Sequence, residues 1–298
     1  MKRSHILITG AHRSGTTWTG KVLATAAELR YVQEPFNVAI SKYKPPFSQW
    51  YKFVCDTSSQ QEQQNIERYL NSFLSIHPKH FGTSFTKVST LRGWYHAMAD
   101  IKNRATHRTL FKDPLLLFSA PWFQKHMNSQ IVVLVRHPAA FIASLKVKDW
   151  RFDFNHFLEQ PLLMETVLHD HSSEIKRFSE HEHDLIDQGI LLWNILNNYV
   201  QSKQQQQPHG WYFLKHEQLS LEPVQEFKKL CDFAAVSYSK IMHKAILDTT
   251  QAKDPQDRHR DSKQNITSWK QRLTTDEIAR IKEGTAAVWR YFYSEDDW

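Results

Sequence analysis

Cysteine is scarce in this sequence, and its scarcity argues against two classes of protein. Only Cys55 and Cys231 occur among 298 residues, far apart and outside any C-x-x-C pattern. We therefore expect neither a structural zinc site nor a disulfide framework. We expect both cysteines to be reduced thiols in a cytoplasmic protein, with a single disulfide between them as the alternative. The histidine-rich stretches 169–171 and 181–184 have no matching ligand signature elsewhere, so we expect no metal requirement.

Long hydrophobic runs are also missing. No segment reaches the roughly 18 apolar residues that indicate a membrane-spanning helix. The apolar run 6–8, which follows a basic start, is too short for the core of a signal peptide. We therefore expect no stable membrane insertion.

A clustered basic stripe is the third missing feature. The sequence has 38 Lys and Arg against 31 Asp and Glu, a formal charge of +7 and a pI near 9.2. This excess suits an anionic ligand or a polyanionic partner. Because the basic residues do not cluster, we do not expect binding of nucleic acid or of a sulfated or phosphorylated polymer, which salt would abolish.

The fourth absence is a lysine. The segment "ITGAHRSGTTWTGK" at 8–21 has the glycine spacing of the P-loop G-x-x-x-x-G-K-[ST], through Gly10 and Gly15, but Thr16 stands at the lysine position. A short apolar segment precedes the loop, and apolar residues at helical spacing follow it over 15–29. Strand, glycine-bearing loop and helix in this order are the context of a phosphate loop.

This loop carries the groups that an anion needs. Backbone N–H groups of residues 14–17 would point at the anion, and the helix dipole adds about half a positive charge. Arg13, Thr16 and Thr17 add side-chain donors, and the planar guanidinium matches phosphate or sulfate oxygens. An ordinary turn between strand and helix is the alternative.

A second group lies in "VRHPAAFIASLK". Arg136 ends an apolar strand predicted at 130–136, where open α/β sheets bind ligands, and Ser144 lies in the following helix. The pair could bind a second, separate phosphate. Alternatively, Arg136 pairs with a carboxylate and Ser144 is a small packing residue.

Two more segments supply a cation and carboxylates. Lys112 ends a predicted strand at 108–112, where its charge could stabilise a leaving phosphate. Asp113 could pair with it, act as a base or cap the next helix. Glu34, in a proline-containing loop, is a candidate general base, with a plain surface residue as the alternative.

Strands alternate with helices along the chain. Strands are predicted at 4–10, 108–112, 130–136 and 211–217, with a short one at 85–89, and helices at 15–29, 62–76, 91–103, 114–126, 139–148 and 220–233. Residues 31–61 are predicted to be an irregular loop, 153–204 two helices, and 251–265 a flexible loop. Thr274 and Glu277 form a capping box for the last helix. We predict one α/β domain over 1–298, a three-layer P-loop fold with a mainly parallel central sheet flanked by helices and helical insertions.

These motifs together resemble a family. "HRSGTTW" is similar to the P-[KR]-S-G-T-T-W loop of sulfotransferases that use 3′-phosphoadenosine 5′-phosphosulfate (PAPS). "VRHPAAFIASL" resembles their second motif, an Arg at a strand end and a Ser eight positions later. Residues 211–233 and 262–281 resemble the later strand–helix segment and the cofactor-covering segment of bacterial members. The resemblance spans nearly the whole chain.

The resemblance implies a role for each matching residue. The 5′-phosphosulfate would be held by the P-loop, the adenine would pack on Trp18, and Arg136 with Ser144 would bind the 3′-phosphate. Residues 263–270 would close over the nucleotide. The implied binding residues are Arg13, Ser14, Gly15, Thr16, Thr17, Trp18, Arg136, Ser144, Lys263, Asn265, Ile266 and Trp269.

Two positions depart from the family pattern. Small-molecule sulfotransferases read K-T-H at the third motif and use that His as base, whereas here Lys112 is followed by Asp113 and Pro114. The expected base is therefore Glu34, with Asp113 as second choice, and Lys112 and Arg13 stabilise the leaving phosphate. The C-terminal R-K-G-x-x-G motif lacks both glycines and its Arg, which leaves the contacts there undefined.

The predicted function follows from these assignments. We expect a sulfotransferase of EC 2.8.2 type that moves a sulfuryl group from PAPS to a hydroxyl or amine of a carbohydrate or small metabolite by in-line displacement. Residues 31–53 and 150–193 would line the acceptor site. The alternative is a P-loop kinase or NTPase, which would use the missing lysine and an Asp for Mg²⁺.

Overall fold

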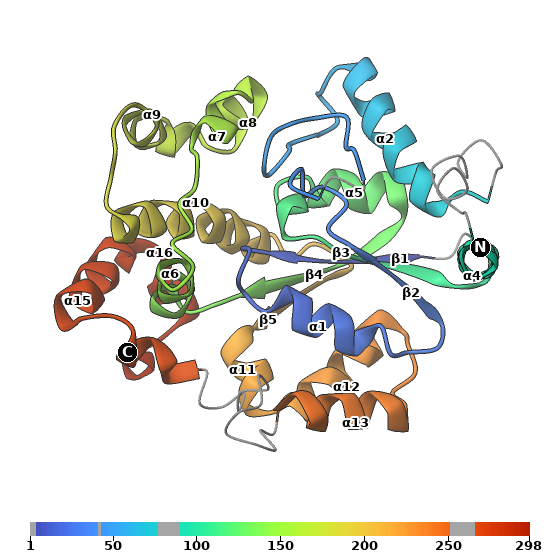
Figure 1. The fold of residues 1–298 in the computed structure, drawn as a ribbon. Helices are drawn as coiled ribbons and strands as arrows, with labels where there is room; N and C mark the ends of the chain where they lie inside the picture. The colour runs from blue at the N-terminus through green and yellow to red at the C-terminus, as the bar shows by residue number, and fades with distance from the viewer. Residues whose placement is uncertain (1–3, 41–42, 77–89, 251–265) are drawn as a thin grey trace.

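The central sheet is parallel throughout. The computed structural model describes residues 4–40, 43–76, 90–250 and 266–298 (Figure 1). Five strands pair in the order β2-β3-β1-β4-β5. Their bounds are β1 His5–Gly10, β2 Leu29–Gln33, β3 Arg108–Lys112, β4 Ser129–Val135 and β5 Trp211–Lys215.

The sheet is buried on both faces because its strands are apolar on both sides. In β4, Ile131 and Val133 join one hydrophobic cluster, while Val132 and Leu134 join the other. One face is covered by α1 Thr16–Leu23, α11 His216–Leu221, α12 Pro223–Ala234 and α13 Lys240–Thr250 (Figure 1). The other is covered by α2 Gln60–Leu74, α5 Ala120–Met127, α6 Pro138–Lys146 and α10 Leu185–Gln205. These three layers confirm the predicted α/β architecture.

The remaining helices lie around the margins of the sheet. Helix α4 is bound to edge strand β2 through the Arg30–Asp100 ion pair. Helices α7 to α10 and a 3₁₀ turn lie over 155–205, where only two helices were predicted, and α15 begins at the predicted capping box. The bounds are α4 Leu91–Thr106, α7 Asn155–Leu158, α8 Pro161–Thr166, α9 Ser172–Glu180, α15 Thr275–Gly284 and α16 Ala286–Phe292, with 3₁₀ turns at Pro114–Leu116, His169–His171, Ser268–Gln271 and Glu295–Asp297.

The chain reverses direction across the sheet beside β1. The crossover from β1 to β2 runs through α1 on one face, whereas those from β3 and β4 run through α5, α6 and α10 on the other. Such a reversal opens a crevice at the carboxyl ends of the strands. The P-loop, Lys112 and Arg136 all follow strands at this edge.

Some predicted boundaries were wrong. The helix predicted over 15–29 ends at Leu23, and 29–33 form edge strand β2 instead of a loop. Pro223 divides the helix predicted at 220–233 into α11 and α12, and a 3₁₀ turn precedes α5. The strand predicted at 85–89 and the loop predicted at 251–265 lie outside the described residues.

The described part of the chain contains no helix that combines the length and the apolar character needed to cross a bilayer.

Candidate active site

Two glycines shape the P-loop. Gly10 ends β1 at φ 135, and a Cβ there would lie 2.2 Å from the Leu134 carbonyl oxygen on β4. Gly15 is the N-cap of α1 at φ 92, and its Cβ would lie 2.4 Å from Nδ1 of His216. Both positions combine a left-handed backbone with a close neighbour, so only glycine fits them. The loop therefore brings its backbone N–H groups to the start of α1.

Arg13 joins the two motifs that lie far apart in the sequence. Its backbone is left-handed, at φ 66, and its Nε donates to Ser144 Oγ at 2.9 Å. Nη1 of Arg136 donates in turn to the Arg13 carbonyl oxygen at 2.7 Å. The structure thus places Arg13, Arg136 and Ser144 in one hydrogen-bonded group, a link between the two motifs that the sequence did not predict.

Arg136 is a partly buried cation with one unused hydrogen-bond donor. Burial lowers the pKa of its guanidinium to about 10, although the nearby Glu217 carboxylate opposes this shift, so Arg136 stays charged at neutral pH. Its Nε is buried and has no hydrogen-bond partner among the described residues. Glu217 is held by the His137 backbone N–H at 3.0 Å and by the Tyr293 hydroxyl at 2.9 Å. An unpaired buried donor on a cation is suited to an anionic ligand.

Lys112 and Glu34 form an ion pair at the edge of the sheet. Lys112 is 0% exposed, and its Nζ contacts Oε1 of Glu34. The other carboxylate oxygen accepts a hydrogen bond from Asn37 Nδ2 at 2.8 Å. Glu34 has a left-handed backbone, at φ 49, and its N–H donates to the Lys112 carbonyl oxygen at 2.7 Å. The carboxylate is therefore fixed from both ends.

The Asp113 carboxylate accepts hydrogen bonds from backbone N–H groups. Its two oxygens accept the N–H groups of Leu115, at 2.9 Å, and Phe36, at 2.6 Å. It is the N-cap of the 3₁₀ turn at Pro114–Leu116, as one of the sequence alternatives expected. Burial raises the pKa of this carboxyl to about 7. The geometry favours a role in holding the Glu34 loop over a role as base.

A cavity of about 570 Å³ opens beside these groups. Arg13, Glu34 and Arg136 lie on its wall together with the P-loop. The predicted residues that line it are Arg13, Gly15, Thr16, Thr17, Trp18, Glu34 and Arg136. Residues that line it without having been assigned from the sequence are His12, Lys21, Asn37, Trp50, Pro114, Leu115, Trp150, His216, Ser220 and Thr249. Trp50 and Trp150 do fall in the two segments predicted to line an acceptor site.

Trp18 and His216 form one end of this cavity. The Trp18 indole Nε1 donates to Thr249 Oγ1 at 2.9 Å, which joins α1 to α13. Its ring contacts those of His216 and Phe227, at centroid distances of 6.2 and 5.7 Å. Burial lowers the pKa of His216 to about 3, so its ring is neutral. This end therefore offers a fixed indole and an uncharged polar ring.

Other predicted residues lie away from the cavity wall. Ser14 is buried, and its hydroxyl contacts the Ala11 carbonyl oxygen. Trp269 is buried and stacks on His137 at a centroid distance of 5.2 Å. Ile266 opens the last described segment, whereas Lys263 and Asn265 lie outside the described residues. The nucleotide contacts assigned to these residues stay predictions.

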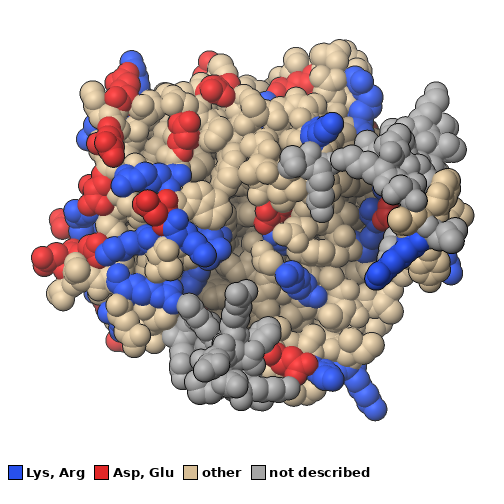
Figure 2. Space-filling view, in the orientation of Figure 1, with Lys and Arg blue, Asp and Glu red and all other residues tan. Residues whose placement is uncertain are grey.

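Charges on the face drawn in Figure 2 are mixed in sign. Blue and red side chains alternate at its left, around α15. The ion pairs there include Lys146–Glu277, Arg280–Asp184 and Lys282–Glu295. Within the described residues, no three His, Cys, Asp or Glu side chains gather as a metal site.

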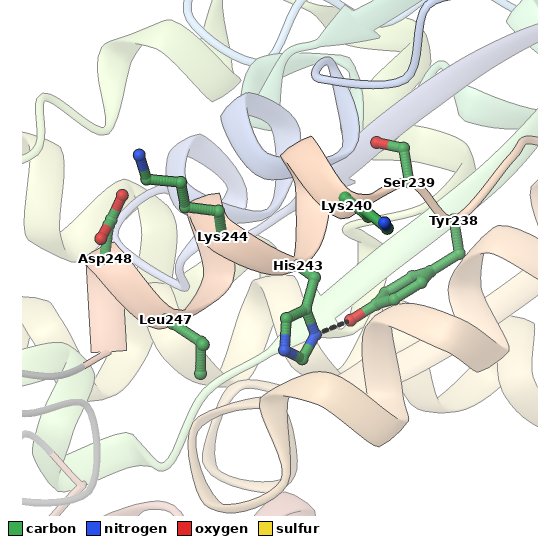
Figure 3. Close-up of a pocket in the computed structure, with 7 residues that line it drawn as sticks. All are labelled: Tyr238, Ser239, Lys240, His243, Lys244, Leu247 and Asp248. Atoms are coloured by element: carbon green, nitrogen blue, oxygen red, sulfur yellow. Dashed lines mark hydrogen bonds between the residues drawn. The ribbon is translucent and has the colours of Figure 1, made fainter.

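A second hollow, of about 450 Å³, lies on α13 (Figure 3). It is lined by Tyr238, Lys240, His243, Lys244 and neighbouring residues, and the Tyr238 hydroxyl lies 2.8 Å from His243 Nδ1. None of the P-loop residues line it. The cavity beside the P-loop is therefore the candidate active site.

Comparison with known proteins identifies the family. The family model described as sulfotransferase domain matches residues 3–290, so the chain belongs to the sulfotransferase-domain family. One similar solved structure is the sulfotransferase domain from the curacin biosynthetic pathway, with 15% identity and a TM-score of 0.49 over 95% of this chain and 97% of that chain. Another is the sulfotransferase domain from the Synechococcus PCC 7002 olefin synthase, with 15% identity and a TM-score of 0.49 over 99% of this chain and 98% of that chain. A mouse sulfotransferase complexed with PAP is also similar, with 13% identity and a TM-score of 0.46 over 100% of this chain and 88% of that chain. No curated protein matches the sequence.

Proposed function

We propose that this protein transfers a sulfuryl group from PAPS to a hydroxyl or amine of a carbohydrate or small metabolite. The observation that carries the proposal is the link between the P-loop and the second motif, through Arg13, Arg136 and Ser144. It puts a partly buried cation beside a loop whose backbone N–H groups are suited to an anion. A ligand with two separate anionic groups fits this arrangement, and PAPS has a 5′-phosphosulfate and a 3′-phosphate.

The cavity has the features that such a nucleotide needs. Gly15 lets the loop pack directly against His216, because a Cβ there would lie 2.4 Å from Nδ1 of that ring. Arg136 has an unused buried donor, and Trp18 offers an indole at the same end. Arg13, Thr16 and Thr17 would hold the phosphosulfate, Arg136 and Ser144 the 3′-phosphate, and Trp18 the adenine.

The reaction moves one group and one proton. PAPS supplies a sulfuryl group on a phosphate leaving group, so the acceptor oxygen or nitrogen bonds to sulfur as the bond from sulfur to the phosphate oxygen breaks. Glu34 accepts the acceptor proton, because each carboxylate oxygen retains a lone pair beyond its bond to Lys112 or Asn37. Arg13 and Lys112 neutralise charge that develops on the leaving phosphate.

Calorimetry on the full chain tests the class of nucleotide. We expect adenosine 3′,5′-bisphosphate to bind more tightly than ATP with Mg²⁺, because Thr16 replaces the P-loop lysine and β4 leads into Arg136 instead of Asp. A preference for ATP with Mg²⁺ would instead support a kinase or NTPase. Mass spectrometry of extracts treated with PAPS and the protein, scanned for a sulfate adduct, then tests transfer itself.

Arg136→Lys separates the two phosphate sites. We expect affinity for adenosine 3′,5′-bisphosphate to fall about 10- to 100-fold, because lysine keeps the charge but loses the guanidinium fork. Affinity for adenosine 5′-monophosphate, which lacks the 3′-phosphate, should change only slightly. The matched control is Arg290→Lys on the α16 surface, where Arg290 lies over the Trp289 ring. Equal losses for both nucleotides would show that Arg136 acts only by holding the P-loop.

A further inference from the structure

His12 lines the cavity beside the P-loop and is surrounded by aromatic rings. Its ring centroid lies 5.1 Å from that of Trp150, 5.4 Å from Phe141 and 6.0 Å from Trp50. The side chain lines the cavity but is only 5% exposed. The position immediately precedes Arg13, so it borders the phosphate loop on one side and the aromatic wall on the other.

The Tyr51 hydroxyl determines which nitrogen of His12 carries the hydrogen. Tyr51 is fully buried, with its Oη 2.7 Å from His12 Nδ1, and it accepts the His12 backbone N–H at 3.3 Å. The Tyr51 hydroxyl can therefore donate its own hydrogen to Nδ1 of His12. Leaving a buried hydroxyl proton unbonded is costly, so the pair favours the form in which Tyr51 donates to Nδ1. The neutral ring then carries its hydrogen on Nε2.

The ring stays neutral throughout the physiological range. Burial, assisted by the charge of Arg13, lowers the pKa of His12 to about 3. Nε2 has no hydrogen-bond partner among the described residues. A neutral imidazole with Nδ1 engaged cannot take a proton from an acceptor in a single step at Nε2, but it can donate a hydrogen bond there.

The cavity wall carries the cations Arg13, Lys21 and Arg136 together with apolar and neutral side chains. Trp50, Trp150, Pro114 and Leu115 are apolar, and Asn37 is neutral. Glu34 contributes the acidic group on the cavity wall. The indole rings of Trp50 and Trp150 suit the C–H face of a sugar ring.

We propose that His12 is a specificity-determining residue that donates its Nε2–H to a second oxygen of a neutral carbohydrate acceptor. Glu34 receives the proton of the hydroxyl that is sulfated, while Trp50 and Trp150 contact the sugar ring. Tyr51 is the positioning residue, because it acts only through His12. The proposal rests on the function proposed above and assigns the acceptor class within it.

The tautomer of His12 can be measured without any turnover. Two-bond ¹H–¹⁵N correlation on the full chain with labelled histidine distinguishes protonated from unprotonated ring nitrogens. We expect Nε2 of His12, assigned by loss of its signals in His12→Phe, to be protonated near neutral pH and Nδ1 to be unprotonated. In Tyr51→Phe the ring should lose this preference. A protonated Nδ1 in the unaltered protein overturns the assignment.

Acceptor selectivity gives the functional test. Rates with PAPS are compared for a neutral methyl pyranoside series, its deoxy analogues, the matching uronic acids and simple phenols. His12→Phe keeps a flat ring without the donor, so we expect KM for the preferred pyranoside to rise about three- to tenfold. Its preference over the deoxy analogue that lacks the second oxygen should shrink toward unity, with affinity for adenosine 3′,5′-bisphosphate retained.

A control variant accompanies the selectivity test, and different results would contradict the role of His12 and the proposed function. His183→Phe replaces a histidine that stacks on Phe178, outside this cavity, and should leave the preference unchanged. An unaltered deoxy discrimination in His12→Phe, or a preference for phenols or uronic acids, overturns the inference. Absence of transfer to any acceptor would instead defeat the proposed function, while the tautomer measurement stays independent of it.

Discussion

Replacing Glu34 by glutamine is expected to lower turnover about 10²- to 10⁴-fold, the usual contribution of a general base. The amide keeps the shape of the side chain and an oxygen that can still face Lys112, but it cannot take the acceptor proton. Affinity for adenosine 3′,5′-bisphosphate should stay within a few-fold, because Glu34 contacts Lys112 and Asn37 and none of the P-loop backbone. Single-turnover rates with labelled PAPS measure the first quantity, and calorimetry measures the second.

Retained nucleotide affinity also serves as the folding control, because glutamine leaves the buried Lys112 without its counter-charge. Glu62→Gln provides a matched change, since Glu62 also pairs with a lysine, Lys52, but lies outside the cavity wall. It should leave turnover unchanged. If Glu34→Gln is as active as the unaltered protein, Glu34 is not the base.

Gly15→Ala is expected to weaken binding of adenosine 3′,5′-bisphosphate at least about 100-fold, from two effects that add. A left-handed backbone costs a non-glycine residue about 1–2 kcal/mol. The new Cβ would also lie 2.4 Å from the buried Nδ1 of His216, whose ring also contacts Trp18. The loop must then shift, and its backbone N–H groups no longer converge on the phosphosulfate. Calorimetric titration of the nucleotide measures the loss.

A double variant separates these two effects. His216→Ala removes the ring against which the new Cβ collides, so Gly15→Ala with His216→Ala should regain part of the lost affinity compared with Gly15→Ala alone. The backbone contribution at φ 92 should persist. Nucleotide binding by Gly15→Ala equal to that of the unaltered protein would contradict the close packing of the loop against His216.

Most of the sheet was predictable from local composition. Strands β1, β3, β4 and β5 are short apolar runs that end at, or just before, a polar residue or glycine, and they lie within two residues of the predicted bounds. Strand β2 was missed because "LRYVQ" alternates only partly and buries just Leu29 and Val32. It is an edge strand paired with β3 alone, so its conformation depends on residues about 80 positions away.

The candidate site also contains residues that the sequence could predict and residues that it could not. Arg13, Thr16, Arg136 and Ser144 lie in short motifs, so the sequence could mark them as candidates. His216 and Thr249 reach the cavity because the fold brings distant segments together, whereas His12 adjoins Arg13 in the P-loop segment and was overlooked there. Lys112 and Glu34 were each predicted as site residues, but the ion pair between them was not predicted.

The left-handed backbones of Arg13, Glu34 and Tyr51 set a limit on the stability of this protein. Each such residue costs about 1–3 kcal/mol relative to a relaxed conformation. A chain with glycine at all three positions would relieve this strain, yet it would lose the guanidinium that holds Ser144, the carboxylate beside Lys112 and the hydroxyl that fixes His12. Selection for heat resistance alone would therefore favour sequences that lose these groups, whereas selection for activity keeps them.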